Sequence, residues 1–216
     1  LAFIGAAGPE DNVEAVAKRM RRVLGMGDGW AGEIGSWTEA LKVLRDAAED
    51  AGILVVINGV VGNDTHRKLD PAEFRGFVLA DVYAPLVFIN GADARSAQMF
   101  TLAHELAHLW LGEGGIFDLP DLEAAGDPRE VFCNRVAAEF LVPGDELGRF
   151  WPEAKRQAEP FQAIARTFKV SPIVAARRAL DLELIGRHAF FQFYSAYQAD
   201  ERRRDRSVEG VRCVSR

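Results

Sequence analysis

The chain has 216 residues, of which 49% are hydrophobic and 27% are charged. A chain of this length and composition can bury a hydrophobic core, either as one domain or as one domain with a small additional region. Its formal net charge of −6 gives no overall attraction to nucleic acids or anionic membranes, so any contact with DNA would have to be local.

Two helices and a small sheet are predicted in the first part of the chain. Apolar residues recur at helical spacing from Glu10 to Leu24, and the sequence GMGDG then interrupts the pattern. A second helix is expected up to Gly52, because the hydroxyl of Ser36 can cap it and Glu39 follows at the capping-box spacing. Three strand-like runs come next, ILVVIN, FRGFVLA and PLVFIN, separated by Gly, Asn, Asp and Pro.

Helices are predicted for most of the remaining chain. The segment Ala94–Leu111 has a helical pattern, and the sequence DPREVFCNRVAAEFLVP predicts another helix that Pro143 closes. Shorter helices follow to about Tyr197. The order of helices, strands and helices predicts an α+β fold rather than repeated βαβ units. We expect a first domain at residues 1–143 and a C-terminal helical region with a basic tail at residues 144–216.

The segment TLAHELAHLW, residues 101–110, places polar groups inside an apolar helix. Residues four apart share a helix face, so His104 and His108 can direct their imidazoles at one point, while Glu105 lies about 100° round the helix from His104. This is the HExxH arrangement, in which two imidazoles bind zinc and the glutamate takes a proton from water. A coincidental spacing of two structural histidines is the less favoured interpretation.

A catalytic zinc site needs a third protein ligand, for which Glu130 is the first candidate. It lies near the start of the following helix, where the small residue Ala137 on the same face would let that helix approach the HExxH helix. Glu139 lies about 180° round this helix and cannot face the same metal. A capping role is an equally good interpretation of Glu130, because Asp127 and Pro128 can occupy the N-cap and first helical positions. Weaker candidates in the intervening loop are Glu113, Asp118, Asp121 and Glu123.

Two segments, FTLAHELAHLWLG and EVFCNRVAAEFLVP, resemble the ImmA/IrrE family of zinc metallopeptidases. The signature of that family joins a helical HExxH to a later Glu-x-x-(Ala/Cys)-Asn segment that ends in a Leu-x-Pro-like stop. The runs FRGFVLADVYAPLVFINGADARSAQ and FKVSPIVAARRALDLELI are also similar, so the resemblance covers about residues 10–185. It implies a zincin-like fold, Zn2+ as cofactor and Glu130 as third ligand. Phe132 stands where relatives often have an acid, which excludes a ligand at that position.

The resemblance also implies an intracellular endopeptidase whose substrate is a helix-turn-helix transcriptional repressor. In such an enzyme Glu105 would act as general base, and a further group would donate a hydrogen bond to the oxyanion. The strand Pro85–Asn90 is expected at a sheet edge beside the HExxH helix, where an extended substrate could pair with it, and a core strand is the equally good alternative. The oxyanion donor stays open among Tyr83, His66, His188, Arg75 and Tyr194.

The sequence FQAIARTFKVSPIVAARRAL has the pattern of a helix-turn-helix. The alternative function is therefore a DNA-binding transcriptional regulator that uses residues 161–185 and holds zinc structurally. Positive charge in this segment comes from Arg166, Lys169, Arg177 and Arg178. The start of its second helix is apolar, however, where DNA-reading helices carry polar side chains, and we expect packing or protein docking instead. A pseudo-peptidase with structural zinc is a third interpretation, which the presence of Glu105 argues against.

No signal peptide and no membrane-spanning segment is predicted. The opening LAFIGAAG is apolar, but it lacks basic residues and is too short to cross a bilayer. The cysteines, Cys133 and Cys213, form no CxxC pair, which fits a reducing compartment. We therefore expect a cytoplasmic protein with a protein substrate as its partner, DNA as a less favoured partner, and no membrane contact.

Overall fold

The computed structural model describes the chain except for residues 63, 113–114, 118–126 and 214–216; the side chains of 115–117 and 201–213 are also left undescribed. The first two helices are α1 (Val13–Val23) and α2 (Trp37–Asp50). The Ser36 hydroxyl accepts a hydrogen bond from the backbone N–H of Glu39 at 3.1 Å, as the capping pattern predicts.

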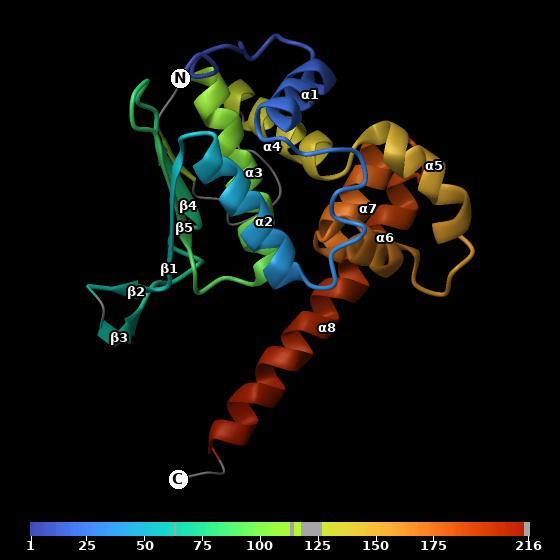
Figure 1. Cartoon of the computed structure of the whole chain (residues 1–216). Helices are drawn as coiled ribbons and strands as arrows, with labels where there is room; N and C mark the ends of the chain where they lie inside the picture. Colours follow the sequence, from blue (N-terminus) through green and yellow to red (C-terminus); the bar gives the residue numbers. More distant parts are fainter. Residues whose placement is uncertain (63, 113–114, 118–126, 214–216) are drawn as a thin grey trace.

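A mixed sheet follows, with four strands in the order β1-β5-β4-β6 among the described residues. Strand β5 runs parallel to β1, and β4 runs antiparallel to both of its neighbours. A separate hairpin of β2 and β3 projects from the body of the protein (Figure 1). The strand bounds are β1 (Leu54–Asn58), β2 (Val60–Val61), β3 (Asp64–Lys68), β4 (Gly76–Leu79), β5 (Leu86–Asn90) and β6 (Gly115–Phe117).

Of the two interpretations of PLVFIN, the core strand is confirmed and the edge strand is wrong. These residues form β5, which lies between β1 and β4, so both of its edges are already paired. Val87, Ile89 and Asn90 are fully buried, as expected for an inner strand with a nearly continuous apolar sequence. Within the described part of the chain, the outer positions of the sheet belong to β1 and β6.

Helix α3 (Arg95–Leu111) packs across one face of the sheet together with α2 (Figure 1). It is buried on all sides, because apolar residues are spread around its whole circumference rather than along one stripe. Gly112 ends the helix in the left-handed conformation, at φ 72°. The HExxH segment therefore lies in the centre of the molecule.

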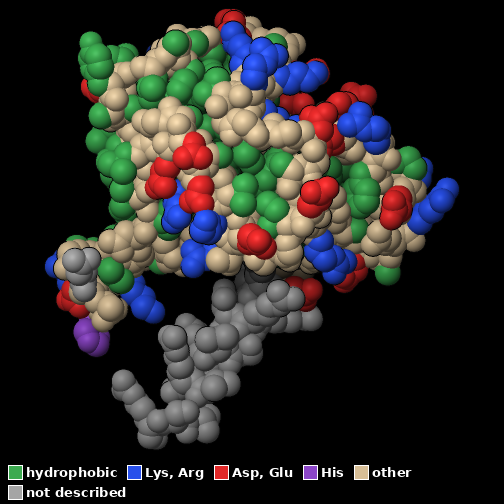
Figure 2. Space-filling view, in the orientation of Figure 1, with side chains coloured by type: hydrophobic (Ala, Val, Ile, Leu, Met, Phe, Trp, Pro, Cys, Tyr) green, Lys and Arg blue, Asp and Glu red, His purple; other side chains and the backbone are tan. Residues whose placement is uncertain are grey.

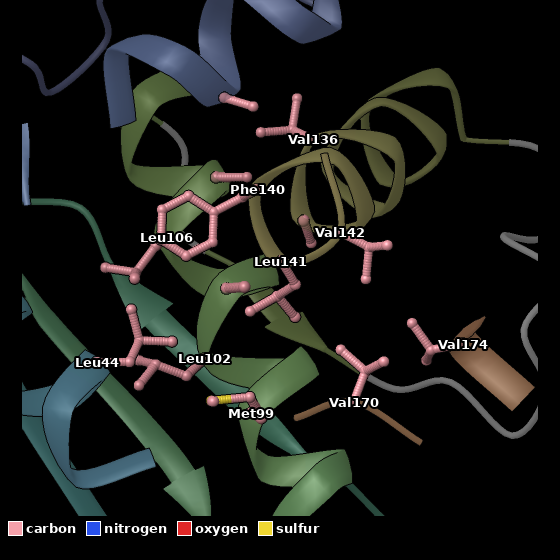
Figure 3. Packing of buried hydrophobic residues seen from close by; sticks show 14 of the residues in the cluster. Leu44, Met99, Leu102, Leu106, Val136, Phe140, Leu141, Val142, Val170 and Val174 are labelled. Atoms are coloured by element: carbon pink, nitrogen blue, oxygen red, sulfur yellow. The ribbon is translucent and has the colours of Figure 1, made fainter. Parts of the chain in front are cut away.

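Helix α4 (Pro128–Leu141) packs against both α1 and α3. Ala103 and Ala107 on α3 and Ala137 on α4 are fully buried, and their small side chains permit close packing. Figure 3 shows Leu106 of α3 beside Phe140 and Leu141 at the end of α4. These contacts fix α4 next to the HExxH helix.

Four further helices complete the described chain: α5 (Gly144–Ala154), α6 (Pro160–Phe168), α7 (Pro172–Asp181) and α8 (Arg187–Cys213). Val170 and Val174 belong to the same hydrophobic cluster as Phe140 and Leu141, so the core continues past residue 143 (Figure 3). The predicted α+β class is confirmed, and the division at residue 143 stays a prediction. None of the described helices is both long enough and apolar enough to cross a membrane.

Candidate metal centre

Two neighbouring helices bring the predicted metal-binding side chains together. His104 and His108 lie on consecutive turns of α3 and are 0% and 6% exposed. Glu130 lies in the first turn of α4, the helix that packs beside α3. The candidate ligand atoms of these three residues lie within 4.8 Å of one another.

The Glu130 carboxylate lies against both imidazoles, one oxygen near each ring. Nε2 of His104 lies 3.2 Å from Oε2 of Glu130, and Nε2 of His108 lies 3.2 Å from Oε1 of the same carboxylate. The two Nε2 atoms are 3.0 Å apart. Tetrahedral zinc with bonds of 2.0–2.1 Å separates its ligand atoms by about 3.3 Å. The measured separations of 3.0–3.2 Å are therefore close to those that a single tetrahedral ion requires.

The protonation states of the centre also suit a cation. Burial lowers the pKa of His104 to about 4, although its interactions with Glu130 and Asn134 act in the opposite direction. Burial acts to raise the pKa of Glu130, but its hydrogen bonds to His104 and His108 outweigh burial and hold that pKa well below its usual range. Near neutral pH the centre thus offers a neutral His104 imidazole and an ionised Glu130 carboxylate, the forms in which these groups bind metals.

Glu105 is a buried carboxylate without a hydrogen bond from the described part of the protein. The residue is 1% exposed, and neither Oε1 nor Oε2 has a partner there. Burial, followed by the negative charge of Glu130, raises its pKa well above the usual value. A buried acid with no protein partner is costly to keep, and such a group marks a place where water, a metal or a substrate is expected.

The structure separates the two interpretations of Glu130 by geometry. The side chain of Asp127 caps α4 by accepting a hydrogen bond from the N–H of Arg129 at 2.9 Å. The carboxylate of Glu130 instead faces the two imidazoles. Glu139 lies farther along α4 and forms an ion pair with Arg178. The side chains of Glu113, Asp118, Asp121 and Glu123 lie outside the described residues.

The candidates for an oxyanion donor are spread over several elements. Tyr83 is 90% exposed in the connection from β4 to β5, and His66 is exposed on the β2–β3 hairpin. Arg75 lies 3.7 Å from Asp93, measured from Nε to Oδ2. His188 and Tyr194 belong to α8. The structure singles out none of the five for this role.

Asn134 is a residue of the centre to which the sequence reasoning gave no role. It follows Glu130 by four positions on α4, so both residues lie on the same helix face. Its side chain acts to raise the pKa of the His104 imidazole, although its Oδ1 has no hydrogen bond within the described part of the chain. A partner on a metal-binding histidine fixes the tautomer and orientation of the ring. The i, i+4 spacing from Glu130 was the signal available in the sequence.

The sequence profile Peptidase_M78, described as the IrrE N-terminal-like domain, matches residues 48–180. The chain belongs to this family. The matched part contains α3 and α4 and extends beyond residue 143 to α7. Membership of Peptidase_M78 agrees with the zincin-like fold that the sequence predicts.

The chain was also compared with curated proteins and with solved structures. A search of curated proteins finds no match. Among solved structures, a Mycobacterium tuberculosis transcriptional regulator is 21% identical and superposes with a TM-score of 0.46. The superposition covers 78% of this chain and 46% of the regulator, so the chain spans less than half the length of that protein.

Proposed function

We propose that this chain is a zinc-dependent endopeptidase that cleaves one partner protein, a helix-turn-helix transcriptional repressor. The observation that carries the proposal is the buried Glu105 carboxylate, which has no hydrogen bond from the described residues and lies beside the converging donors of His104, His108 and Glu130. The membership of a peptidase family supports the same chemistry. The nature of the partner rests on the resemblance to ImmA/IrrE proteins, which is an analogy.

His104, His108 and Glu130 would hold a zinc ion, and a catalytic zinc with three protein ligands keeps one position open for water or substrate. When bound, zinc supplies a Lewis acid for the scissile carbonyl and makes water nucleophilic near neutral pH. Glu105 accepts one proton from this water as the water oxygen attacks the carbonyl carbon. Glu105 then delivers the proton to the amide nitrogen as the carbon–nitrogen bond breaks. The products are a carboxylic acid and an amine, so Glu105 returns to its starting form.

A peptidase of broad specificity would damage the proteins of its host. We therefore expect this enzyme to be selective for one partner. An enzyme limits such damage when a folded partner must dock before its cleaved segment can reach the centre. Helices α5 to α8 contribute none of the proposed metal ligands. We therefore assign docking of the partner to this C-terminal helical region.

The alternative function, DNA binding through α6 and α7, has less support because two of its four cations, Lys169 and Arg178, are buried. Lys169 and Arg178 are only 5% and 8% exposed. Lys169 donates a hydrogen bond to the carbonyl of Arg166, and Arg178 forms an ion pair with Glu139. Buried cations cannot neutralise phosphates, so only Arg166 and Arg177 of this segment are exposed for contact with DNA.

The exposed cations of the segment do not form a basic face either. Arg177 lies 3.0 Å from Asp181, measured from Nε to Oδ1. Figure 2 shows Lys and Arg side chains interspersed with Asp and Glu on the face in view. The helix-turn-helix shape therefore fits packing and protein docking better than DNA contact.

The function is tested by incubating the zinc-loaded protein with candidate substrates and identifying products by mass spectrometry. The candidates are the repressor encoded nearest its gene, unrelated repressors and unfolded casein, each also incubated with the Glu105→Gln variant. A single cut in the neighbouring repressor by the parent, with none by the variant, is the expected result. Rapid degradation of casein, or no cleavage of any repressor by zinc-loaded protein, would contradict the proposal.

A further inference from the structure

Gly76 lies where the sheet closely approaches the proposed general base, Glu105. It is the first residue of β4 and is buried, and it pairs with Ile89 of β5 and Phe117 of β6. Side chains alternate between the two faces of a strand, so position 76 faces the same way as the buried Val78. That face is covered by α3, where Thr101 and Glu105 lie one turn apart.

A side chain at this position has no space. A Cβ atom built on Gly76 would lie 2.7 Å from Cγ2 of Thr101 and 2.8 Å from the backbone oxygen of Phe88. It would also lie 3.2 Å from Oε1 of Glu105. The contact with Phe88 involves the backbone of the neighbouring strand, which cannot move away as a flexible side chain can. The strand itself or the Glu105 carboxylate would therefore have to shift.

Backbone conformation does not require glycine here. Gly76 is absent from the residues of positive φ, a region that favours glycine. Glycine also weakens the interior of a strand, because it packs no side chain and loses more conformational freedom on folding. The close approach of β4 to α3 is the remaining reason for a glycine at this position.

The close approach of β4 to α3 brings the backbone of β4 next to the Glu105 side chain. Neither of its carboxylate oxygens has a hydrogen bond within the described chain, so packing against neighbouring atoms holds the side chain in place. We propose that Gly76 is a positioning residue: its missing side chain lets β4 form the wall against which the Glu105 carboxylate rests beside the metal centre. This inference rests on the proposed role of Glu105 as general base.

The test compares Gly76→Ala with Gly59→Ala as a matched control. A Cβ atom on Gly59 would lie 2.9 Å from the backbone nitrogen of Ala92, a similar degree of crowding that does not involve Glu105. Crystal structures of both variants with zinc are expected to show a changed Glu105 rotamer in Gly76→Ala alone. Zinc affinity, measured by competition with a chelator, is expected to be unchanged in both, because the proposed ligands lie on α3 and α4.

A second variant keeps the inference testable if the first does not fold. If Gly76→Ala does not fold, Gly76→Ala combined with Thr101→Ser removes the nearest side-chain atom and keeps the hydroxyl that bonds to Ala97. A Glu105 carboxylate in its parental position in the folded variant, or displaced equally in Gly59→Ala, would overturn the inference.

Hydrolysis by the same preparations separates this inference from the proposed function. A general base displaced by about 1 Å should lower turnover by about 100-fold. If the parent protein hydrolyses nothing, the proposed function fails, whereas the position of Glu105 in the two variants still decides the role of Gly76.

Discussion

The Nε2 atoms of His104 and His108 lie 3.0 Å apart on consecutive turns of a buried helix. A hydrogen bond between the two imidazoles would be enough to explain this distance. It would not account for Glu130, whose two carboxylate oxygens each lie 3.2 Å from one of these nitrogens. Three donors that converge from two helices are better explained by a common ligand, and a small cation is the ligand that their chemistry suits.

Replacement of Glu130 by Gln should lower zinc affinity sharply. The change keeps the shape of the side chain but removes the anionic donor. Mutation of a residue that only supports a metal ligand typically lowers metal affinity about 10–100-fold. Loss of a ligand itself should therefore lower zinc affinity by about 100-fold or more. Competition with a chromophoric chelator measures the effect, and Glu153→Gln, which neutralises an exposed carboxylate on α5, is the control. Tight stoichiometric zinc binding by Glu130→Gln would show that another acid is the ligand.

Replacement of Asn134 by Ala should weaken zinc binding by about 10–100-fold, because His104 would lose the neighbouring amide that acts on its imidazole. Asn134→Asp keeps an oxygen acceptor and should recover most of the affinity. Arg135→Ala, at an exposed position on the same helix, controls for general effects on α4. An unchanged affinity in Asn134→Ala would mean that packing alone orients His104.

The sequence was sufficient for features that depend on local spacing. Ser36 and Glu39 predicted a helix start because capping is decided within one turn. His104 and His108 were predicted to share a face because helical geometry fixes residues four apart. Glu130 was different: its spacing fitted a cap and a ligand equally, and only the family resemblance favoured the ligand.

Features that depend on contacts between distant segments could not be predicted from the sequence. The order of strands in the sheet is set by long-range pairing, so the sequence could not decide whether PLVFIN is an edge strand or a core strand. The β2–β3 hairpin was not predicted, because its exposed residues show no burial pattern. Gly76 carried no signal of its own, since its importance comes from atoms of Thr101 and Glu105 in a different element.

The stability of the metal-free protein should depend on pH through Glu105. Burial raises the folded-state pKa of this carboxyl well above its usual value of 4.5. The proton on Glu105 therefore contributes stability below about pH 4.5, and this contribution is lost as the pH rises through the folded-state pKa. Glu105→Gln has no such proton to lose, so the variant should gain stability relative to the parent as the pH rises.

Thermal unfolding in the presence of a chelator, between about pH 5 and about pH 8, measures this difference. His104 is present in both proteins, so its own titration affects both melting temperatures alike. A difference in melting temperature that stays constant over this range would contradict a raised pKa for Glu105.

Arg178 should prove to be a structural residue rather than a DNA contact. Its Nε donates a hydrogen bond to the carbonyl of Val142 at 2.9 Å, and its guanidinium pairs with Glu139. The two side chains of this ion pair are 9% and 12% exposed. Arg178→Ala leaves the Glu139 carboxylate buried without its cation, and breaking a buried pair in this way costs about 3–5 kcal/mol. Urea unfolding of the parent and variant measures the loss.

The double variant Arg178→Ala, Glu139→Gln distinguishes the two roles of Arg178. Glutamine keeps the oxygen that accepts the N–H of Gly144 but carries no charge to be left unpaired. The double variant should therefore lose less stability than the sum of the two single variants. A DNA-contacting arginine would behave differently: Arg178→Ala would stay within about 1 kcal/mol of the parent, as exposed ion pairs do, and would weaken DNA binding in a salt-dependent manner. Arg178 joins α7 to the end of α4, the helix that carries Glu130. We therefore expect Arg178→Ala to lower the free energy of unfolding and to leave DNA affinity unchanged.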